Sequence, residues 1–182
     1  MTRPIAKPLT PALSPQAGRG RGATKPGVKR RGPMRSTDDP MSVAFAEARE
    51  AERRGETPIG AALARDGKVI ASAGNQTRGD SDPTAHAEMI VLRQAAASLG
   101  EHRLTDCDLY VTLEPCAMCA GAISHARLRR LYYAAPDPKG GAVEHGPRFF
   151  SQPTCLHAPE VYGGIRESEA AAMLRAFFVA RR

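Results

Sequence analysis

The sequence predicts an α/β domain in which helices cover a mixed β-sheet. From residue 41 onward, a helix, a hairpin, a helix, a strand, a helix and a strand precede a last strand and a last helix. Alternation of this kind favours one sheet packed between helices. A chain of 182 residues is long enough to form one such domain with a proper hydrophobic core.

The first half of the domain is expected to contain a helix, a hairpin and a second helix. Small apolar residues recur at helical spacing over residues 41–54. An Asp-Gly pair at 66–67 is typical of a tight hairpin turn between strands 59–64 and 69–73. Apolar positions at helical spacing then predict a helix over residues 85–99.

The second half continues with a buried strand. Residues 109–113 form a near-continuous apolar run, which indicates a strand covered on both faces. A helix over 116–126 and a strand over 131–135 follow it. A short strand at 161–162 and a helix over 167–182 end the chain.

Two stretches leave alternatives open. The long segment 136–160 has no clear periodicity and interleaves basic and aromatic residues, which suits stacking on splayed RNA bases. Phe149 and Phe150 could equally pack as a lid on the core. Three arginines before the strand at 131–135 could hold phosphates or be a solvated strand entrance: Arg127, Arg129 and Arg130.

The positive charge is concentrated in the first forty residues. The formal net charge is +7, and residues 1–40 supply all of it, with nine Lys or Arg and two Asp. Residues 41–182 are balanced, so overall charge does not argue that the domain binds nucleic acid. The Pro-, Gly- and Arg-rich composition predicts that 1–40 is a disordered leader. It could be an RNA-binding tail or a targeting leader, or translation could start at Met34 or Met41 and leave 1–40 as upstream sequence.

The chain is expected to act in the cytoplasm. No apolar run approaches the roughly 20 residues that a membrane helix needs, and no apolar core follows the basic start. Cys107 and Cys155 are interpreted as reduced thiols, although the sequence alone leaves a disulfide between them open.

Four side chains form the candidate catalytic centre: His86, Glu88, Cys116 and Cys119. An imidazole and two thiolates select zinc, and three protein ligands leave one position open, as in catalytic zinc sites. Water bound at that position ionises near neutral pH. We therefore predict that His86, Cys116 and Cys119 bind one zinc ion per subunit. Glu88 is left to transfer protons as the catalytic residue.

The spacing places this centre at two helix N-termini. Cys116 and Cys119 are three residues apart, so both can face one side of a helix, and Pro115 suits its first position. His86 and Glu88 are two apart and would diverge in the middle of a helix. They converge only if the site lies at the start of their helix.

Each half of the pattern has a simpler explanation when taken alone. A C-x-x-C pair can be redox-active, and an isolated histidine is usually a core or surface residue. H-x-E followed by P-C-x-x-C is far more specific, because the combination is the signature of zinc nucleobase deaminases. The chain contains both parts, as H-A-E at 86–88 and P-C-A-M-C at 115–119.

Longer runs carry a resemblance to one family. D-P-T-A-H-A-E-M-I-V-L-R-Q-A at 82–95 and T-L-E-P-C-A-M-C-A-G-A-I at 112–123 resemble the bacterial tRNA-specific adenosine deaminases. The likeness covers residues 41–182 and is weakest over 136–160. It implies a cytidine-deaminase-like three-layer sandwich and a homodimer. It also implies hydrolytic deamination of adenosine to inosine at the wobble position of a tRNA anticodon loop, with the anticodon arm as partner.

The resemblance also implies a set of substrate contacts. Asn75 is expected to hydrogen-bond the target nucleoside, although a turn asparagine is the simpler interpretation. Phe178 is also expected on the apolar stripe of the last helix. The full set of implied contacts is Pro58, Ile59, Asn75, Ala87, Pro115, Phe178, Arg181 and Arg182.

Two other functions compete with this one. A free nucleobase or nucleoside deaminase acting on cytosine, cytidine or guanine could share the fold and differ only in what its pocket admits. A zinc-stabilised RNA-binding module would need a fourth protein ligand, and it would leave Glu88 without a role.

Overall fold

The computed structural model describes residues 39–181, and residues 1–38 and 182 are not described. The predicted leader therefore falls almost entirely outside the described part of the chain. The elements follow in the order α1 (Pro40–Arg53), β1 (Gly60–Arg65), β2 (Lys68–Gly74), α2 (Ala87–Leu99), β3 (Cys107–Leu113), α3 (Ala117–Ala126), β4 (Arg130–Ala135), the short 3-10 helix η1 (Phe149–Ser151), β5 (Glu160–Tyr162) and α4 (Glu167–Val179).

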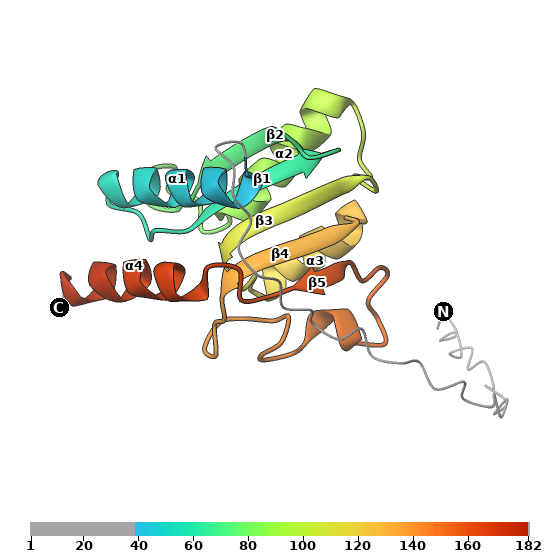
Figure 1. The fold of residues 1–182 in the computed structure, drawn as a ribbon. Helices are drawn as coiled ribbons and strands as arrows, with labels where there is room; N and C mark the ends of the chain where they lie inside the picture. The colour runs from blue at the N-terminus through green and yellow to red at the C-terminus, as the bar shows by residue number, and fades with distance from the viewer. Residues whose placement is uncertain (1–38, 182) are drawn as a thin grey trace, which may run out of the picture.

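The five strands form one mixed sheet in the order β2-β1-β3-β4-β5 (Figure 1). Strand β1 pairs antiparallel with both β2 and β3, whereas β3, β4 and β5 run parallel. The parallel pairing of β3 with β4 requires a crossover, and α3 supplies it. The predicted mixed sheet is therefore confirmed.

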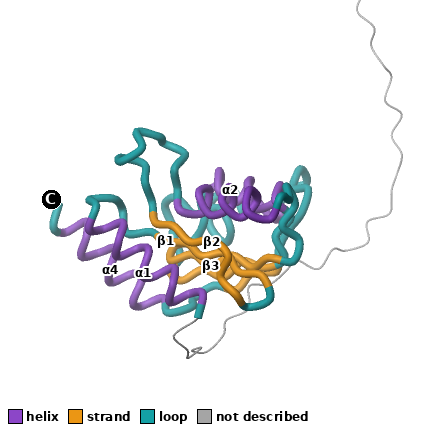
Figure 2. The backbone as a smooth tube through the Cα atoms, turned by 90° about the horizontal axis from the view of Figure 1, so that it is seen from above, coloured by secondary structure: helices purple, strands orange, loops and turns teal. Residues whose placement is uncertain are grey.

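Helices cover both faces of the sheet. Helices α1 and α4 lie side by side on one face, and α2 lies on the other (Figures 1 and 2). Helix α3 contacts α2, and its buried side chains join the same core cluster. Strand β3 serves both layers, because Leu109 and Val111 pack toward α2 and α3 while Tyr110 packs with α1 and β4. This confirms that the strand is covered on both faces.

Local sequence explains the ends of several elements. Asp66 and Gly67 have φ values of 52° and 78°, the paired positive values that a tight two-residue hairpin turn requires. Gly100 ends α2 in the left-handed conformation with φ at 66°. No helix of the described residues is long and apolar enough to cross a membrane.

Asp39 begins α1, so the predicted domain boundary at residue 41 falls inside the helix. Its carboxylate accepts hydrogen bonds from the backbone N–H groups of Met41 at 3.3 Å and Ser42 at 3.2 Å. These are two of the N–H groups that the first turn of a helix cannot satisfy itself. Met41 is only 1% exposed, so the start of α1 belongs to the core.

We expect a chain that begins at Ser36 to unfold at the same temperature as the full chain. A chain that begins at Met41 should be less stable by about 1 kcal/mol, because it lacks the helix cap. Thermal unfolding of both chains measures the difference. Asp39→Ala and Asp39→Asn in the full chain are the controls: the alanine should reproduce the loss, while the asparagine keeps a capping oxygen. Equal stability of the two shortened chains would contradict the role of the cap.

Candidate active site

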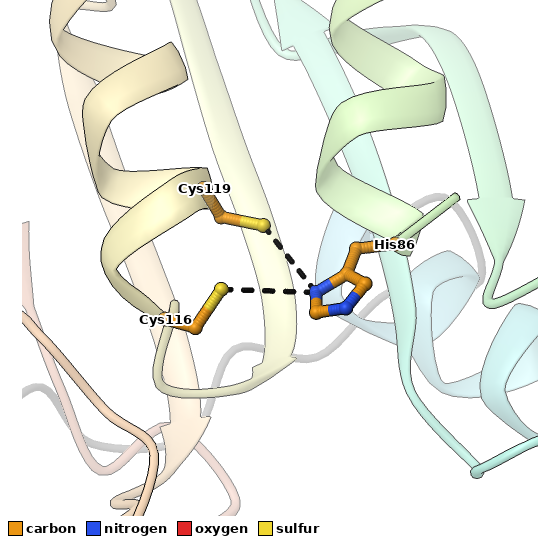
Figure 3. Close-up of side chains that lie close together, drawn as sticks. All are labelled: His86, Cys116 and Cys119. Atoms are coloured by element: carbon orange, nitrogen blue, oxygen red, sulfur yellow. Dashed lines mark hydrogen bonds between the residues drawn. The ribbon is translucent and has the colours of Figure 1, made fainter. Parts of the chain in front are cut away.

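His86, Cys116 and Cys119 meet where two helices begin. His86 is the N-cap residue of α2, Cys116 is the N-cap residue of α3, and Cys119 lies in the first turn of α3. Figure 3 shows the three side chains facing one another between the two helix ends. The Nδ1 atom of His86 lies 3.8 Å from Cys116 Sγ and 3.6 Å from Cys119 Sγ. All three ligand atoms lie within 4.8 Å of one another.

These distances fit a zinc ion held by three ligands. Zinc binds sulfur at about 2.3 Å and histidine nitrogen at about 2.0–2.1 Å, so a tetrahedral site separates the two kinds of atom by roughly 3.6 Å. The observed Nδ1–Sγ separations of 3.6 and 3.8 Å match that spacing. The predicted ligand set therefore has both the chemistry and the spacing for the metal.

The start of α3 differs from the prediction in one detail. Pro115 is not the first helical residue, because Cys116 is the N-cap and the helix begins at Ala117. The backbone of Cys116 is extended, with φ at −71° and ψ at 175°. Its side chain leaves the helix at an angle that a residue inside the helix would not have. This is how both thiols reach the same imidazole.

Glu88 lies beside the metal ligands but is not one of them. It is in the first turn of α2 and only 4% exposed. Burial raises the pKa of its carboxyl group, opposed in part by hydrogen bonding to its own backbone and by the charge on His86. A carboxyl group with a raised pKa binds a proton more readily, which suits a residue that carries a proton during a reaction.

The two thiols differ in how easily they lose a proton. The hydrogen bond from Cys119 lowers the pKa of Cys116 to about 4, and His86 contributes in the same direction. The same hydrogen bond, together with burial, raises the pKa of Cys119. One thiolate is therefore already present at neutral pH, and it faces an imidazole at a helix N-terminus, which favours negative charge.

Asn75 fixes the start of α2. Its Oδ1 atom accepts a hydrogen bond from the backbone N–H of Ala87 at 2.9 Å. His86 makes no capping hydrogen bond with its side chain, so Asn75 supplies the cap from a distant part of the chain. The backbone N–H of Asn75 in turn donates to the carbonyl of Ile59 at 2.9 Å. A single buried residue therefore links the start of β1 and the end of β2 to the metal-binding helix.

The other predicted substrate contacts divide into two groups. Ile59, Asn75 and Ala87 lie together beside His86, and Pro115 lies beside Cys116. Pro58 is buried next to Ile59. Phe178 lies on α4 and Arg181 just beyond its end; their side-chain contacts in the described part of the chain are with Phe177 and not with the site. Arg182 lies outside the described residues.

Phe178 does not belong to the apolar stripe of α4, and that prediction is wrong. It is 54% exposed, whereas its neighbour Phe177 is 2% exposed. Successive residues of a helix are about 100° apart, so two adjacent phenylalanines cannot both face the sheet. Arg181 packs its guanidinium group over the ring of Phe177, 3.6 Å from the ring centre.

The structure settles three questions that the sequence left open. Arg129 pairs with Asp108 at 2.9 Å and Arg130 with Glu160 at 3.2 Å, so both guanidinium groups already have carboxylate partners. Phe150 is buried in the core and Phe149 packs against it edge-on, as expected for a lid. The cysteines outside the metal site are free thiols.

Two buried glutamates beside the site were missed at the sequence level. Glu56 accepts hydrogen bonds from the backbone N–H groups of Arg78 and Gly79, both at 2.8 Å. Glu114 binds backbone N–H groups on the other side of the site. Burial alone would raise the pKa of Glu114, but the hydrogen bonds from Asp137, His145 and Glu144 together lower it. Each glutamate holds one loop that flanks the metal ligands.

Comparisons with known proteins agree with this site. The family model of the cytidine and deoxycytidylate deaminase zinc-binding region matches residues 34–135. With the mixed sheet and the three-ligand centre, this match places the chain among the zinc-dependent deaminases of the cytidine-deaminase class. A tRNA-specific adenosine deaminase of Agrobacterium fabrum is 63% identical over 142 residues, which are 78% of this chain and 93% of that protein. The chain belongs to the family of tRNA-specific adenosine deaminases.

Solved structures show the same fold. One comes from a study of A-to-I editing by tRNA:A34 deaminases at the wobble position of transfer RNA. It has a TM-score of 0.73 and 64% identity, covering 74% of this chain and 98% of that one. A guanine deaminase from Bacillus subtilis is 40% identical with a TM-score of 0.53, covering 56% of this chain and 66% of that one. The predicted cytidine-deaminase-like sandwich is therefore confirmed.

We expect Cys116→Ala and Cys119→Ala each to lose most bound zinc, because two ligands no longer outcompete the hydration of the ion. Cys155→Ala is the matched control, since it removes a half-buried thiol outside the centre. Metal analysis of the purified proteins should find about one zinc per chain in the wild type and in the control. Full zinc content in either Cys116→Ala or Cys119→Ala would show that the ligands are assigned wrongly.

Proposed function

We propose that this chain hydrolytically deaminates adenosine to inosine at the wobble position of a tRNA anticodon loop. The observation that carries the proposal is the meeting of three zinc ligands with one buried carboxylate that does not bind the metal. The A-to-I editing described for the tRNA:A34 deaminases of similar structure supports the choice of substrate. The loop adenosine must leave its stack to reach the centre, which costs less in a single-stranded loop than in a duplex.

Two tasks fall to the residues of the site, which are metal binding and proton transfer. His86, Cys116 and Cys119 would hold zinc, which activates water as a nucleophile at neutral pH when it is bound. Glu88 takes a proton from the attacking water on its carboxylate. It delivers that proton to the purine ring nitrogen. It then takes the second proton of the same water from the hydroxyl group now on C6 and gives it to the amino group, so that the C6–N bond breaks, ammonia leaves and the inosine carbonyl forms. Its burial keeps the carboxyl group from sharing its proton with bulk water.

Asn75 joins substrate recognition to the position of the metal-binding helix. Its Oδ1 atom is already used by the Ala87 N–H group, so the amide Nδ2 is the group that would donate to the nucleoside. A pocket that offers a donor rejects bases that leave it unpaired. One side chain therefore both caps α2 and reads the substrate.

A free guanine deaminase is the second candidate, because one of the similar structures has that activity. That likeness covers a smaller part of both chains than the likeness to the tRNA:A34 deaminase. Ammonia release from tRNA, free adenosine, cytidine and guanine distinguishes the candidates. Release from guanine but not from tRNA would replace the proposed function.

The proposal also covers where the chain acts and how it assembles. The chain acts in the cytoplasm, where tRNA is modified, and it forms a homodimer in which RNA reaches across both subunits. The resemblance to the tRNA-specific adenosine deaminases supports both. Light scattering of the full chain with and without tRNA tests the dimer.

Glu88→Gln is expected to keep zinc and the fold while inosine formation falls by at least about 10²- to 10⁴-fold, because an amide cannot carry the proton. The measurements are zinc content, tRNA binding and inosine detected by primer extension. Glu50→Gln is the matched control, since Glu50 lies on α1 and pairs with Arg54 at the surface. A Glu88→Gln protein that deaminates at nearly the wild-type rate would rule out this route for the proton.

Substitutions of Asn75 should separate its two roles. Asn75→Ala removes both the cap and the donor, so we expect a stability loss of about 1 kcal/mol and weaker tRNA turnover. Asn75→Asp keeps an oxygen for the Ala87 N–H group and loses only the donor, so the fold should stay stable while turnover falls. Thermal unfolding and kcat/KM for tRNA test this pair. Full activity in Asn75→Asp would contradict a role of the amide in recognition.

A further inference from the structure

Glu114 is the most heavily hydrogen-bonded side chain near the site, and the proposed chemistry does not use it. Its side chain is fully buried. It accepts hydrogen bonds at 2.8 to 3.0 Å from backbone N–H groups of one loop, at residues 137, 143, 144 and 145. The Nδ1 atom of His145 lies 2.7 Å from its Oε2 atom. A carboxylate with this many donors fixes the path of a segment that has no regular secondary structure.

The segment that Glu114 holds lies against the metal-binding turn. Ala142 donates its backbone N–H to the carbonyl of Pro115 at 2.9 Å, and Gly141 forms an isolated bridge with Cys116. The contact is tight, since a Cβ atom on Gly141 would lie 2.5 Å from both the Asp137 carbonyl oxygen and the Glu114 carboxyl carbon. The loop, the carboxylate and a metal ligand therefore form one packed unit.

The outer parts of the same segment carry positive charge. Lys139 lies between the anchored residues 137 and 143, and Arg148 follows the last anchored residue. Both side chains are exposed, and the ion pairs found among the described residues include neither. The guanidinium Nε atom of Arg148 donates to the carbonyl oxygen of Glu144 at 2.9 Å. The N–H of Glu144 donates to Glu114 at 2.8 Å. A single residue of the loop thus connects the buried carboxylate to an exposed cation.

We propose that Glu114 is a positioning residue that fixes the segment 137–148 beside the metal centre and so places Lys139 and Arg148 for contact with the tRNA backbone. The inference rests on the proposed function, because it takes the RNA as the substrate. Glu114 touches neither substrate nor metal in this role. It acts through the loop, since main-chain donors that lose their acceptor no longer hold one conformation.

The first test is the kinetics of inosine formation on tRNA by Glu114→Gln. A glutamine keeps one acceptor oxygen and replaces the other with an NH2 group. The backbone N–H groups that bind the second carboxylate oxygen in the wild type then have no acceptor. We expect KM to rise about tenfold, the order expected when hydrogen bonds to a charged acceptor are lost, while kcat and zinc content stay near the wild-type values. A purely structural residue would instead lower the melting temperature and the active fraction and leave KM unchanged.

A second variant tests the same idea without altering the carboxylate. Gly141→Ala should push the loop away from Glu114 and raise KM in the same way. Gly140→Ala is the matched control, because its Cβ would meet the Asp137 carboxylate, with the nearest oxygen at 2.9 Å, and no atom of Glu114. KM should stay at the wild-type value in the control. If Glu114→Gln fails to fold, Gly141→Ala decides the question.

A double-mutant cycle identifies the cation involved. If Glu114 acts through Arg148, then Glu114→Gln combined with Arg148→Ala should raise KM by less than the product of the separate increases. A wild-type KM in both Glu114→Gln and Gly141→Ala, or an equal increase in Gly140→Ala, would overturn the inference. Failure of the proposed function is a separate result, because the wild-type protein would then form no inosine on tRNA.

Discussion

The N-termini of α2 and α3 meet at one point, and the rest of the site depends on that meeting. Neither helix carries a complete set of ligands, because His86 comes from one and Cys116 and Cys119 come from the other. The mixed sheet makes the meeting possible, since β2 and β3 both run antiparallel to β1 and so point the same way. They therefore lead to α2 and α3 at the same end of the sheet. A small rotation of either helix would move an Nδ1–Sγ distance away from what the metal requires. The packing of α2 against α3 is therefore a condition for the chemistry.

Backbone N–H groups hold the surroundings of the site in place. Asn75 binds the N–H of Ala87, while Glu56 and Glu114 bind those of the flanking loops. All three side chains are buried, so water does not compete for their donors. The loops gain order without needing regular secondary structure. This arrangement leaves the outward-facing side chains of those loops available to vary with the substrate.

The sequence predicted the residues of the metal centre but not the buried residues that hold the loops around it, and the reason is physical. His86, Glu88, Cys116 and Cys119 are recognisable because metal and proton chemistry require those residue types at those spacings. Glu114 leaves no comparable signal, since its partners are main-chain groups that any residue could supply. The strands of the sheet could be predicted from the hydrophobic pattern, but the exposure of Phe178 could not. Near the end of a helix, no further turn of apolar residues follows to show which side of the helix is buried.

His86 and Cys116 are thirty positions apart in the sequence, and this separation gives metal binding a second consequence. The three ligand atoms come together only in the folded chain, so the free energy of metal binding adds to the stability of the fold. A ligand that binds only the folded chain shifts the folding equilibrium by mass action. The supply of zinc in the cell would therefore influence how long each molecule survives proteolysis, in addition to whether it can react.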